Sequence, residues 1–433
     1  MNHTTLTTSL LLLAIAGTGA GQDLKLTYHT DPKALPPGAI VEDWPRFLGV
    51  RDNATSEETK LLGKWPEGGP SKVWELETGE GYSSPLFAEG RMVYFHRLNH
   101  STLTGEGEEA IDCLDPATGK RHWRVKYPVS YSDRYGFSPG PRSSPVLHEG
   151  RVYVTGVTGI FHCLDLKTGA IQWKRDLQKD YAIPTYFFGY GPSPSPVWND
   201  RIILNVGGRG AGAAGGVCVA AFSTKDGSTL WEVKDQWGAS YASPTITTLQ
   251  GIECAVVAAA GESRPPHGGL LVIDVKSGKV HDRFPWRADK YESVLASSPL
   301  ILGNNRIYLG DCYGLGGVVL EYGRNLRSRV VWKERWFGMH WMMTSVPPHS
   351  RSGGCRRTSL RLPSVPFATP AISQSRLLCG GLIGWLTRWR RSLPLSTYIV
   401  EDWLRYVTVM MFFIVVFAFT GLALRDRALS AEM

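Results

Sequence analysis

A short motif recurs five times in this chain, at spacings of roughly 50 residues. In each copy a Ser-Pro pair opens a short apolar run, and a tight turn and a second apolar run follow. The five pairs are Ser84-Pro85, Ser144-Pro145, Ser195-Pro196, Ser243-Pro244 and Ser298-Pro299. Repeats of this length, each with about four short strands, are typical of β-propellers, in which every repeat forms one blade. The sequence therefore predicts an all-β propeller, a scaffold that by itself names no activity.

A second turn follows in each repeat, and a tryptophan closes the best copies. The pattern Asp-x-x-Thr-Gly-x-x-x-Trp occupies residues 115–123 and 165–173, with weaker copies at residues 223–231 and 274–282. The fourth copy has Asp282 in place of the tryptophan, and the fifth has a displaced Trp332. Glycine gives the turn a positive φ without steric cost. The tryptophan is predicted to fill the space between neighbouring blades.

These repeats resemble those of quinoprotein-type (PQQ-like) β-propellers over about residues 72–334. The segment Asp-Trp-Pro-Arg-Phe-Leu-Gly at residues 43–49 is also similar to the leading segment of secreted members. The resemblance implies a propeller domain at residues 43–337 with about five to six recognisable blades. Because propellers of this family usually have about seven or eight blades, an open arc or an imperfect ring is expected.

The resemblance leaves catalysis and binding open. The family includes quinone-dependent dehydrogenases and the scaffold lipoprotein of the outer-membrane assembly machine. For the dehydrogenases it implies PQQ stacked on a tryptophan, with a calcium ion and an aspartate base. This chain has no adjacent pair of cysteines, and its residues match none of the family's calcium ligands. We therefore predict no catalytic residue, no metal-binding residue and no cofactor, and leave cofactor-binding residues unassigned. PQQ and calcium belong only to the dehydrogenase alternative.

Two segments invite a ligand-binding interpretation. The glycine-rich residues 205–216 lack the Gly-Lys-Ser/Thr ending of a phosphate-binding loop and precede no helical pattern, so we interpret them as a long hairpin. Aromatic residues crowd the loops before the second and third blades: Tyr131, Tyr135, Phe137, Tyr186, Phe187, Phe188 and Tyr190. We interpret these aromatic residues first as side chains that pack under the loops. The alternative is that they line a face or the central channel of the propeller.

The cysteines do not indicate a disulfide framework. Cys113 and Cys163 precede the turn aspartates by two residues in adjacent repeats, and such equivalent positions point into separate blade cores. Together with Cys218 they are predicted to be buried apolar side chains. The chain has no Cys-x-x-Cys motif, so neither a structural zinc site nor a thioredoxin-like motif is indicated.

Residues 1–21 are predicted to be a signal peptide. An apolar stretch at residues 10–16 is followed by small residues at 17–21, although no Lys or Arg precedes it. The stretch is too short to span a bilayer. We therefore expect an exported protein of the periplasm or cell envelope.

The repeat pattern stops after about residue 337. Ser345-Val346-Pro347 lies where a sixth repeat would begin, but the rest of residues 338–400 is rich in Arg, Ser and Pro and lacks strand and turn signals. The whole net charge of +8 lies in residues 335–433, which contain arginine but no lysine. A slip of the reading frame inside the sixth blade explains the break better than a divergent linker does. Residues 340–400 are expected to be poorly ordered.

A run of 18 uncharged residues from Val407 to Leu424 is long enough for one transmembrane helix. Aromatic residues precede it and arginines flank both ends, so the positive-inside signal is not clean. The run predicts a single-pass membrane anchor if the frame is native, and an accident of translation if it is not. The body of the chain is neutral and has no nucleic-acid motif, so no nucleic-acid partner is expected.

These observations predict a secreted or envelope-associated PQQ-like propeller that acts as a binding or assembly scaffold rather than as an enzyme. Its partner is expected to be a protein or another envelope component. Two alternatives stay open, namely a PQQ-dependent dehydrogenase relative and a truncated product of a frame-slipped gene.

The DNA sequence around codons 335–360, read in all three frames, tests the frame-slip hypothesis. We expect an alternative frame to restore a strand-turn-strand pattern and an Asp-x-x-Thr-Gly turn, because Ser345-Val346-Pro347 lies on schedule for a sixth blade. If no frame does so, the tail is native and the chain is a short propeller with a membrane anchor.

Overall fold

A computed structural model describes residues 24–334, apart from residues 62–65, 67–68, 209–215, 263–264, 292 and 294. The chain divides into two compact units, Met1–Thr59 with Val73–His349, and Lys60–Lys72 with Ser350–Met433. The fold described below belongs to the first unit. The predicted signal peptide (1–21), the irregular segment (338–400) and the run from Val407 to Leu424 lie outside the described residues. Within the part that is described, no helix is long and apolar enough to cross a membrane.

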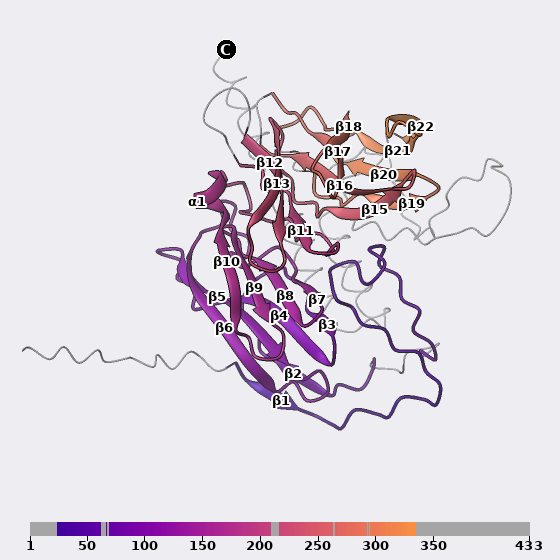
Figure 1. Cartoon of the computed structure of the whole chain (residues 1–433). Coiled ribbons are helices and arrows are strands. Elements are labelled where there is room, and N and C mark those ends of the chain that lie inside the picture. Colours follow the sequence, from indigo (N-terminus) through magenta and orange to yellow (C-terminus); the bar gives the residue numbers. More distant parts are fainter. Residues whose placement is uncertain are drawn as a thin grey trace, which may run out of the picture. The chain divides into compact units, whose positions relative to one another are not determined.

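The described chain is almost entirely β-structure, with one short helix, α1 (Leu177–Tyr181). Five antiparallel sheets follow one another in sequence, and we call them blades 1 to 5. Figure 1 shows the strands of blades 1 and 2 lying side by side. Blade 1 contains β3 (Leu86–Ala88), β4 (Arg91–Leu98), β5 (Glu106–Leu114) and β6 (Arg121–Ser130). Blade 2 contains β7 (Val146–His148), β8 (Arg151–Thr155), β9 (Ile160–Asp165) and β10 (Ile171–Asp176).

The remaining blades repeat this order with small variations. Blade 3 has three strands, β11 (Arg201–Leu204), β12 (Gly216–Ser223) and β13 (Thr229–Asp235). Blade 4 contains β14 (Gly238–Ala239), β15 (Thr245–Leu249), β16 (Ile252–Ala260), β17 (Gly269–Asp274) and β18 (Val280–Pro285). Blade 5 contains β19 (Leu300–Gly303), β20 (Arg306–Asp311), β21 (Gly316–Tyr322) and β22 (Ser328–Glu334). Separately, β1 (Leu26–Tyr28) pairs with β2 (Trp74–Leu76). This succession of antiparallel sheets, each of three to five strands, confirms the all-β prediction and is consistent with a propeller.

The apolar core lies between successive blades. Each of four buried clusters draws side chains from two neighbouring sheets, as shown by the pairs Ile111 with Val152, Phe161 with Phe222, Val219 with Val257, and Val272 with Leu320. The middle strands are therefore buried on both faces, which explains their continuous apolar runs. Cys113, Cys163 and Cys218 lie in these strands as buried free thiols, which confirms the sequence interpretation.

The tryptophan of one unit packs on the second turn of the next blade. Each indole N–H donates to a backbone carbonyl oxygen in that turn, on the residue directly after the Asp or Ser that opens it. The four bonds run from Trp74 to Pro116 at 2.9 Å, Trp123 to Leu166 at 2.9 Å, Trp173 to Thr224 at 3.0 Å and Trp231 to Val275 at 2.8 Å. The Asp115 carboxylate holds its turn by accepting from the Thr118 N–H at 2.8 Å and hydroxyl at 2.9 Å. The predicted role of the tryptophan is thus confirmed.

Two separate constraints require a glycine in each of these turns, namely a positive φ and the close approach of the tryptophan ring. Gly119, Gly169, Gly227 and Gly278 have φ values between +70° and +75°. A Cβ atom on any of them would lie 2.7 to 2.8 Å from the tryptophan ring above it. An alanine would therefore combine an unfavourable φ with a clash against the indole.

Blades 4 and 5 show how the pattern varies. In all five blades the pairing of the last two strands shifts register next to the tryptophan position. At that position Asp282 lies opposite Val272 in blade 4, and Trp332 lies opposite Val319 in blade 5. Asp282 accepts from the Ser328 N–H of blade 5 at 3.3 Å, so a carboxylate replaces the indole at this interface. Trp332 lies at the regular position of its repeat, and its side chain is 37% exposed.

Serines link the starts of the blades. In each link the backbone N–H of one serine donates to the hydroxyl of the serine in the next blade: Ser84 to Ser144 at 3.0 Å, Ser144 to Ser193 at 2.8 Å, Ser193 to Ser243 at 3.1 Å and Ser243 to Ser298 at 3.1 Å. The proline after each serine has no N–H to satisfy. The Ser-Pro motif is therefore an inter-blade contact as well as a strand start.

The third repeat begins two residues earlier than the sequence analysis placed it. Ser193, rather than Ser195, makes the inter-blade links. Ser195 pairs with Ile203 through its N–H, at 2.9 Å, as Leu86 pairs with Val93 in blade 1. The predicted strand at Ser195-Pro196 does not form, and only an isolated bridge joins Trp198 to Arg201. Two consecutive Ser-Pro pairs stand in this repeat, and local sequence does not distinguish them.

Replacing Gly227 by alanine tests the tryptophan contact. Gly251 is a matched control because its φ is +81° but nothing lies within 4 Å of an added Cβ. We expect Gly251→Ala to lower the free energy of unfolding by about 1–2 kcal/mol, from backbone strain alone. Gly227→Ala adds a clash with Trp173, for a total of about 2–5 kcal/mol. Urea unfolding measures both, and equal losses would contradict a tight indole contact.

Candidate functional site

Loops that precede four of the blades bring six aromatic rings together. Tyr135 and Phe137 come from the loop before blade 2, Phe187 and Phe188 from the loop before blade 3, Tyr241 from the segment before β15, and Tyr291 from the loop before blade 5. We call these six residues the loop aromatic cluster. Ring centroids lie 5.6 Å apart for Tyr135 and Phe187, 5.6 Å for Phe188 and Tyr241, and 5.1 Å for Phe187 and Tyr291.

Four of the seven aromatic residues singled out from the sequence belong to this cluster. Of the other three, Tyr186 donates to the Gly207 carbonyl at 2.7 Å and Tyr190 donates to the Asn205 carbonyl at 3.0 Å. These two are buried and act in packing, as the first interpretation held. Tyr131 is also buried, and its hydroxyl donates to Asp133 at 3.2 Å.

Tyr241 and Tyr291 were missed, because each stands alone among non-aromatic residues. Aligning the repeats on the linking serines gives a signal for Tyr241, since Tyr82 and Tyr241 both lie two residues before their serine. Arg142 occupies the same position in blade 2. No comparable signal marks Tyr291.

Polar contacts hold the cluster and its surroundings in place. Arg142 pairs with Asp133 at 2.6 Å, and its guanidinium lies 5.4 Å from the Tyr82 ring centroid and 5.5 Å from that of Tyr131. The Phe188 N–H donates to the Tyr241 hydroxyl at 2.8 Å, and the Phe187 N–H donates to the Glu262 carboxylate. Burial raises the pKa of Tyr241, so this phenol stays protonated. Phe187 is buried and Tyr135 is exposed, so the cluster holds an exposed tyrosine on a fixed aromatic base that suits stacking and apolar contact.

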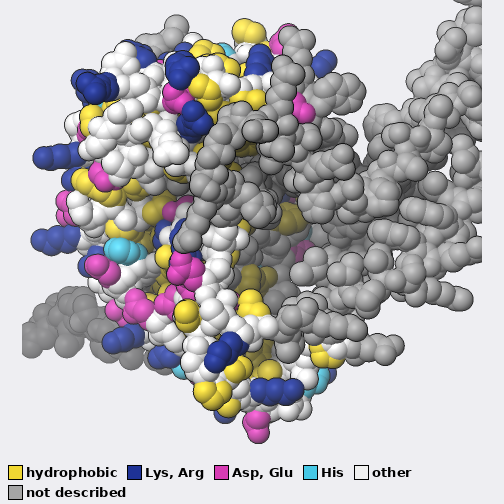
Figure 2. Space-filling view, turned by 90° about the vertical axis from the view of Figure 1, so that its right-hand side faces the viewer, with side chains coloured by type: hydrophobic (Ala, Val, Ile, Leu, Met, Phe, Trp, Pro, Cys, Tyr) yellow, Lys and Arg dark blue, Asp and Glu magenta, His cyan; other side chains and the backbone are white. Residues whose placement is uncertain are grey.

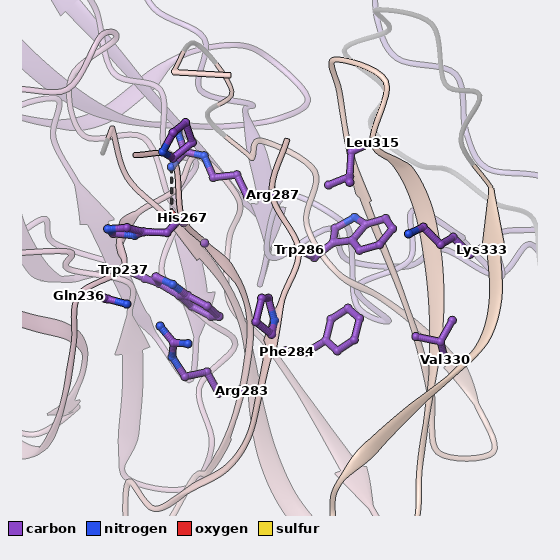
Figure 3. Close-up of a pocket in the computed structure, with 13 residues that line it drawn as sticks. Gln236, Trp237, His267, Arg283, Phe284, Trp286, Arg287, Leu315, Val330 and Lys333 are labelled. Atoms are coloured by element: carbon purple, nitrogen blue, oxygen red, sulfur yellow. Dashed lines mark hydrogen bonds between the residues drawn. The ribbon is translucent and has the colours of Figure 1, made fainter. Parts of the chain in front are cut away.

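Apart from the loop aromatic cluster, a recess with a volume of about 590 Å³ lies beside β18. It is lined by aromatic, apolar and cationic side chains and by no carboxylate: Gln236, Trp237, Pro266, His267, Gly268, Arg283, Phe284, Pro285, Trp286, Arg287, Leu315, Val330 and Lys333. Figure 3 shows Gln236, Trp237, His267 and Arg283 on one side of it, and Leu315, Val330 and Lys333 on the other.

The first side of the recess is built on an ion pair. Arg283 binds Asp235 through two nitrogens, at 2.8 and 3.1 Å, and its guanidinium lies 3.7 Å from the Trp237 ring centroid. Such a two-point pair fixes the plane of the guanidinium. Arg287 instead donates to backbone carbonyls, among them His267 at 3.2 Å and Ser293, and burial lowers its pKa.

Groups that could bind a metal ion are defined only within the described residues. Among these residues no three His, Cys, Asp or Glu side chains lie close enough together to hold a metal ion. The glycine-rich residues join β11 to β12, as predicted, and residues 209–215 lie outside the described ones. On the face that Figure 2 presents, acidic and basic side chains are interspersed, which is unlike a phosphate-binding face.

One buried group resembles a catalytic dyad but is structural. His96 Nε2 lies 3.1 Å from Asp112, while Nδ1 accepts from the Gly79 N–H at 2.9 Å. Arg124 binds both oxygens of Asp112, each at 2.6 Å. His96 and Asp112 are both fully buried. With both ring nitrogens engaged and no access for a substrate, the imidazole cannot act as a general base.

A second buried group links blades 1 and 2. The Glu109 carboxylate accepts from the Tyr127 hydroxyl at 2.7 Å and from the Val157 N–H at 2.9 Å. The Tyr127 ring lies 4.6 Å from the His162 ring. Burial raises the pKa of Glu109, whereas burial, reinforced by Lys174, lowers that of His162 to about 4.

The lowered pKa of His162 predicts a loss of stability in mild acid. The unfolded chain takes up this proton near pH 6.5 and the folded chain only near pH 4, so stability falls as the pH drops through that range. The loss reaches up to about 3 kcal/mol. His162→Phe keeps a ring against Tyr127 and should lose correspondingly less between these pH values. Parallel curves of unfolding free energy against pH for the two proteins would contradict this assignment.

A comparison with models of protein families identifies one family. A family model described as outer membrane protein assembly factor BamB matches residues 107–343. No curated protein matches the chain. A quinohemoprotein alcohol dehydrogenase from Comamonas testosteroni is 14% identical with a TM-score of 0.44, over 69% of this chain and 50% of that one. A europium-containing methanol dehydrogenase is 14% identical with a TM-score of 0.39, over 58% and 50%.

BamB from Moraxella catarrhalis is also similar, with 16% identity and a TM-score of 0.33, over 59% of this chain and 73% of that one. The chain spans half the length of each of the two dehydrogenases.

Proposed function

The chain belongs to the family described as outer membrane protein assembly factor BamB, and on that premise we propose that it is a binding scaffold for a protein of the cell envelope. In this proposal the protein is exported, and its propeller presents loops to the partner without carrying out catalysis. Export through residues 1–21 is part of the same proposal, and so is membrane anchoring from Val407 to Leu424 if the reading frame of the tail is native. So are the domain boundaries at residues 43–337 and 338–400.

The loop aromatic cluster is the observation that carries this proposal. Tyrosine, phenylalanine and arginine are enriched at protein interfaces, and fixed aromatic side chains bind with little loss of conformational entropy. Tyr135 is 53% exposed although its ring touches Phe187 and Phe188, and nearby Tyr82 is 48% exposed. Hydrogen bonds from the Phe187 and Phe188 backbones hold these loops before any partner arrives. The cluster therefore supports a preformed interface.

Removal of the most exposed ring tests the interface. Tyr135→Ala should lower the yield of crosslinked partner protein from envelope fractions at least about fivefold, because truncation of a central aromatic costs more than about 1 kcal/mol of binding energy. Tyr28→Ala is the matched control, since Tyr28 is 49% exposed but lies in β1, outside the cluster. Quantitative mass spectrometry after affinity purification measures the yield. Equal yields from the two variants would contradict a partner site at the cluster.

A PQQ-dependent dehydrogenase is the second candidate, because aromatic rings also stack on a flat quinone. Against it stands the sequence, in which no motif matches the family's calcium ligands. We expect titration of the full chain with PQQ to give no change in the quinone absorbance that depends on calcium. A saturable spectral change that requires calcium, together with oxidation of an alcohol, would replace the scaffold proposal.

A further inference from the structure

The second side of the recess beside β18 is a small site in its own right. It is formed by Phe284, Trp286, Leu315, Val330 and Lys333, which we call the β18–β22 recess. Phe284 lies in β18, Trp286 follows its last residue, and Val330 and Lys333 lie in β22. Figure 3 shows these five side chains grouped together. The whole pocket of about 590 Å³ is of the size that holds a small organic molecule.

One wall of the recess is flat and apolar. Phe284 and Trp286 are two residues apart, so they project to the same side of the chain. Their rings are nearly parallel, with an interplanar angle of 25° and centroids 6.2 Å apart. Leu315 and Val330 complete the apolar lining, and Val330 is 48% exposed. This wall suits a planar apolar body.

The charge of the recess is positive. The Lys333 ammonium lies 4.9 Å from the Trp286 ring centroid and forms an ion pair with no carboxylate among the described residues. The side chains that line the pocket include Lys333, Arg283 and Arg287 but no Asp or Glu. Of these cations, Arg283 is neutralised by Asp235. Lys333 is therefore the cation best placed to receive an anionic group from solvent.

Trp286 contributes an unsatisfied donor. Its side chain is only 6% exposed, and its Nε1–H finds no acceptor among the described residues. A buried donor without a partner is energetically unfavourable, and an incoming acceptor removes that penalty. In Figure 3 the nitrogen-bearing edge of this indole lies on the side of Leu315, within the recess. In contrast, the tryptophans that pack on the turns, such as Trp173, donate to carbonyl oxygens.

We propose that the β18–β22 recess binds a small organic anion that carries a carboxylate on a flat apolar body, such as an arene carboxylate. The carboxylate binds the Lys333 ammonium and accepts from Trp286 Nε1–H, and the apolar body packs on Phe284, Leu315 and Val330. This site is separate from the loop aromatic cluster and goes beyond the proposed role as a protein scaffold.

Calorimetric titration of the full chain with 2-naphthoate at low ionic strength tests the site. Wild-type protein should bind 2-naphthoate at least about tenfold more tightly than the neutral 2-naphthylmethanol, because only the former places a charge beside Lys333. Lys333→Met should weaken binding about tenfold, equivalent to about 1.4 kcal/mol. Lys333→Arg should retain binding within about threefold, since it keeps the charge. Trp286→Phe keeps the flat wall but removes the donor, and should weaken binding about fivefold.

Lys279→Met is the control, because Lys279 is an exposed lysine in the β17–β18 turn and does not line the pocket. It should leave the affinity for 2-naphthoate unchanged. The proposal is overturned if 2-naphthoate does not bind, if the neutral alcohol binds as tightly, or if Lys333→Met binds like wild type. Lys333 is exposed, so its replacement tests the site without disturbing the core. Partner crosslinking through Tyr135 is a separate measurement, so either proposal can fail alone.

Discussion

The packing of a tryptophan on the next blade's turn is the contact on which the rest of this structure depends. A sheet that is apolar on both faces can slide over its neighbour without losing much burial, so the core alone does not fix how two blades align. The indole adds direction to the interface. The Trp173 ring packs so closely on Gly227 that no side chain fits there, and its N–H donates to the Thr224 carbonyl at 3.0 Å. Four successive contacts of this kind fix four successive units.

The serine links add a second contact at three of these interfaces and also join blade 4 to blade 5. Each linking serine is preceded by the loop that enters its blade, and these loops carry the aromatic residues of the cluster. Once the turns and serines have set the blades, Phe188 and Tyr241 are brought together even though 53 residues separate them in the chain. The binding surface is thus a consequence of the repeat rather than of any single motif.

Local features of this fold were predictable, and long-range ones were not. The Asp-x-x-Thr-Gly turns and the tryptophans follow from short-range rules for positive φ and side-chain capping, and the structure confirms them at Gly119 and Gly169. The start of the third repeat was misplaced because Ser193 and Ser195 are both followed by proline. Only the neighbouring blades decide between the two serines. The same is true of Tyr291 and of the Arg283–Trp237 stack, which depend on residues from separate loops and strands.

Hydrogen exchange of a Trp173→Phe variant tests the central claim most directly. The substitution keeps an aromatic ring on β10 but removes the donor to Thr224 of blade 3. We predict that amide protection falls at the turn of blade 3, at Ser223 and Gly227, while the turn under Trp123 at Gly169 keeps its protection. A loss of protection confined to β10 would contradict the claim that the indole holds the next blade.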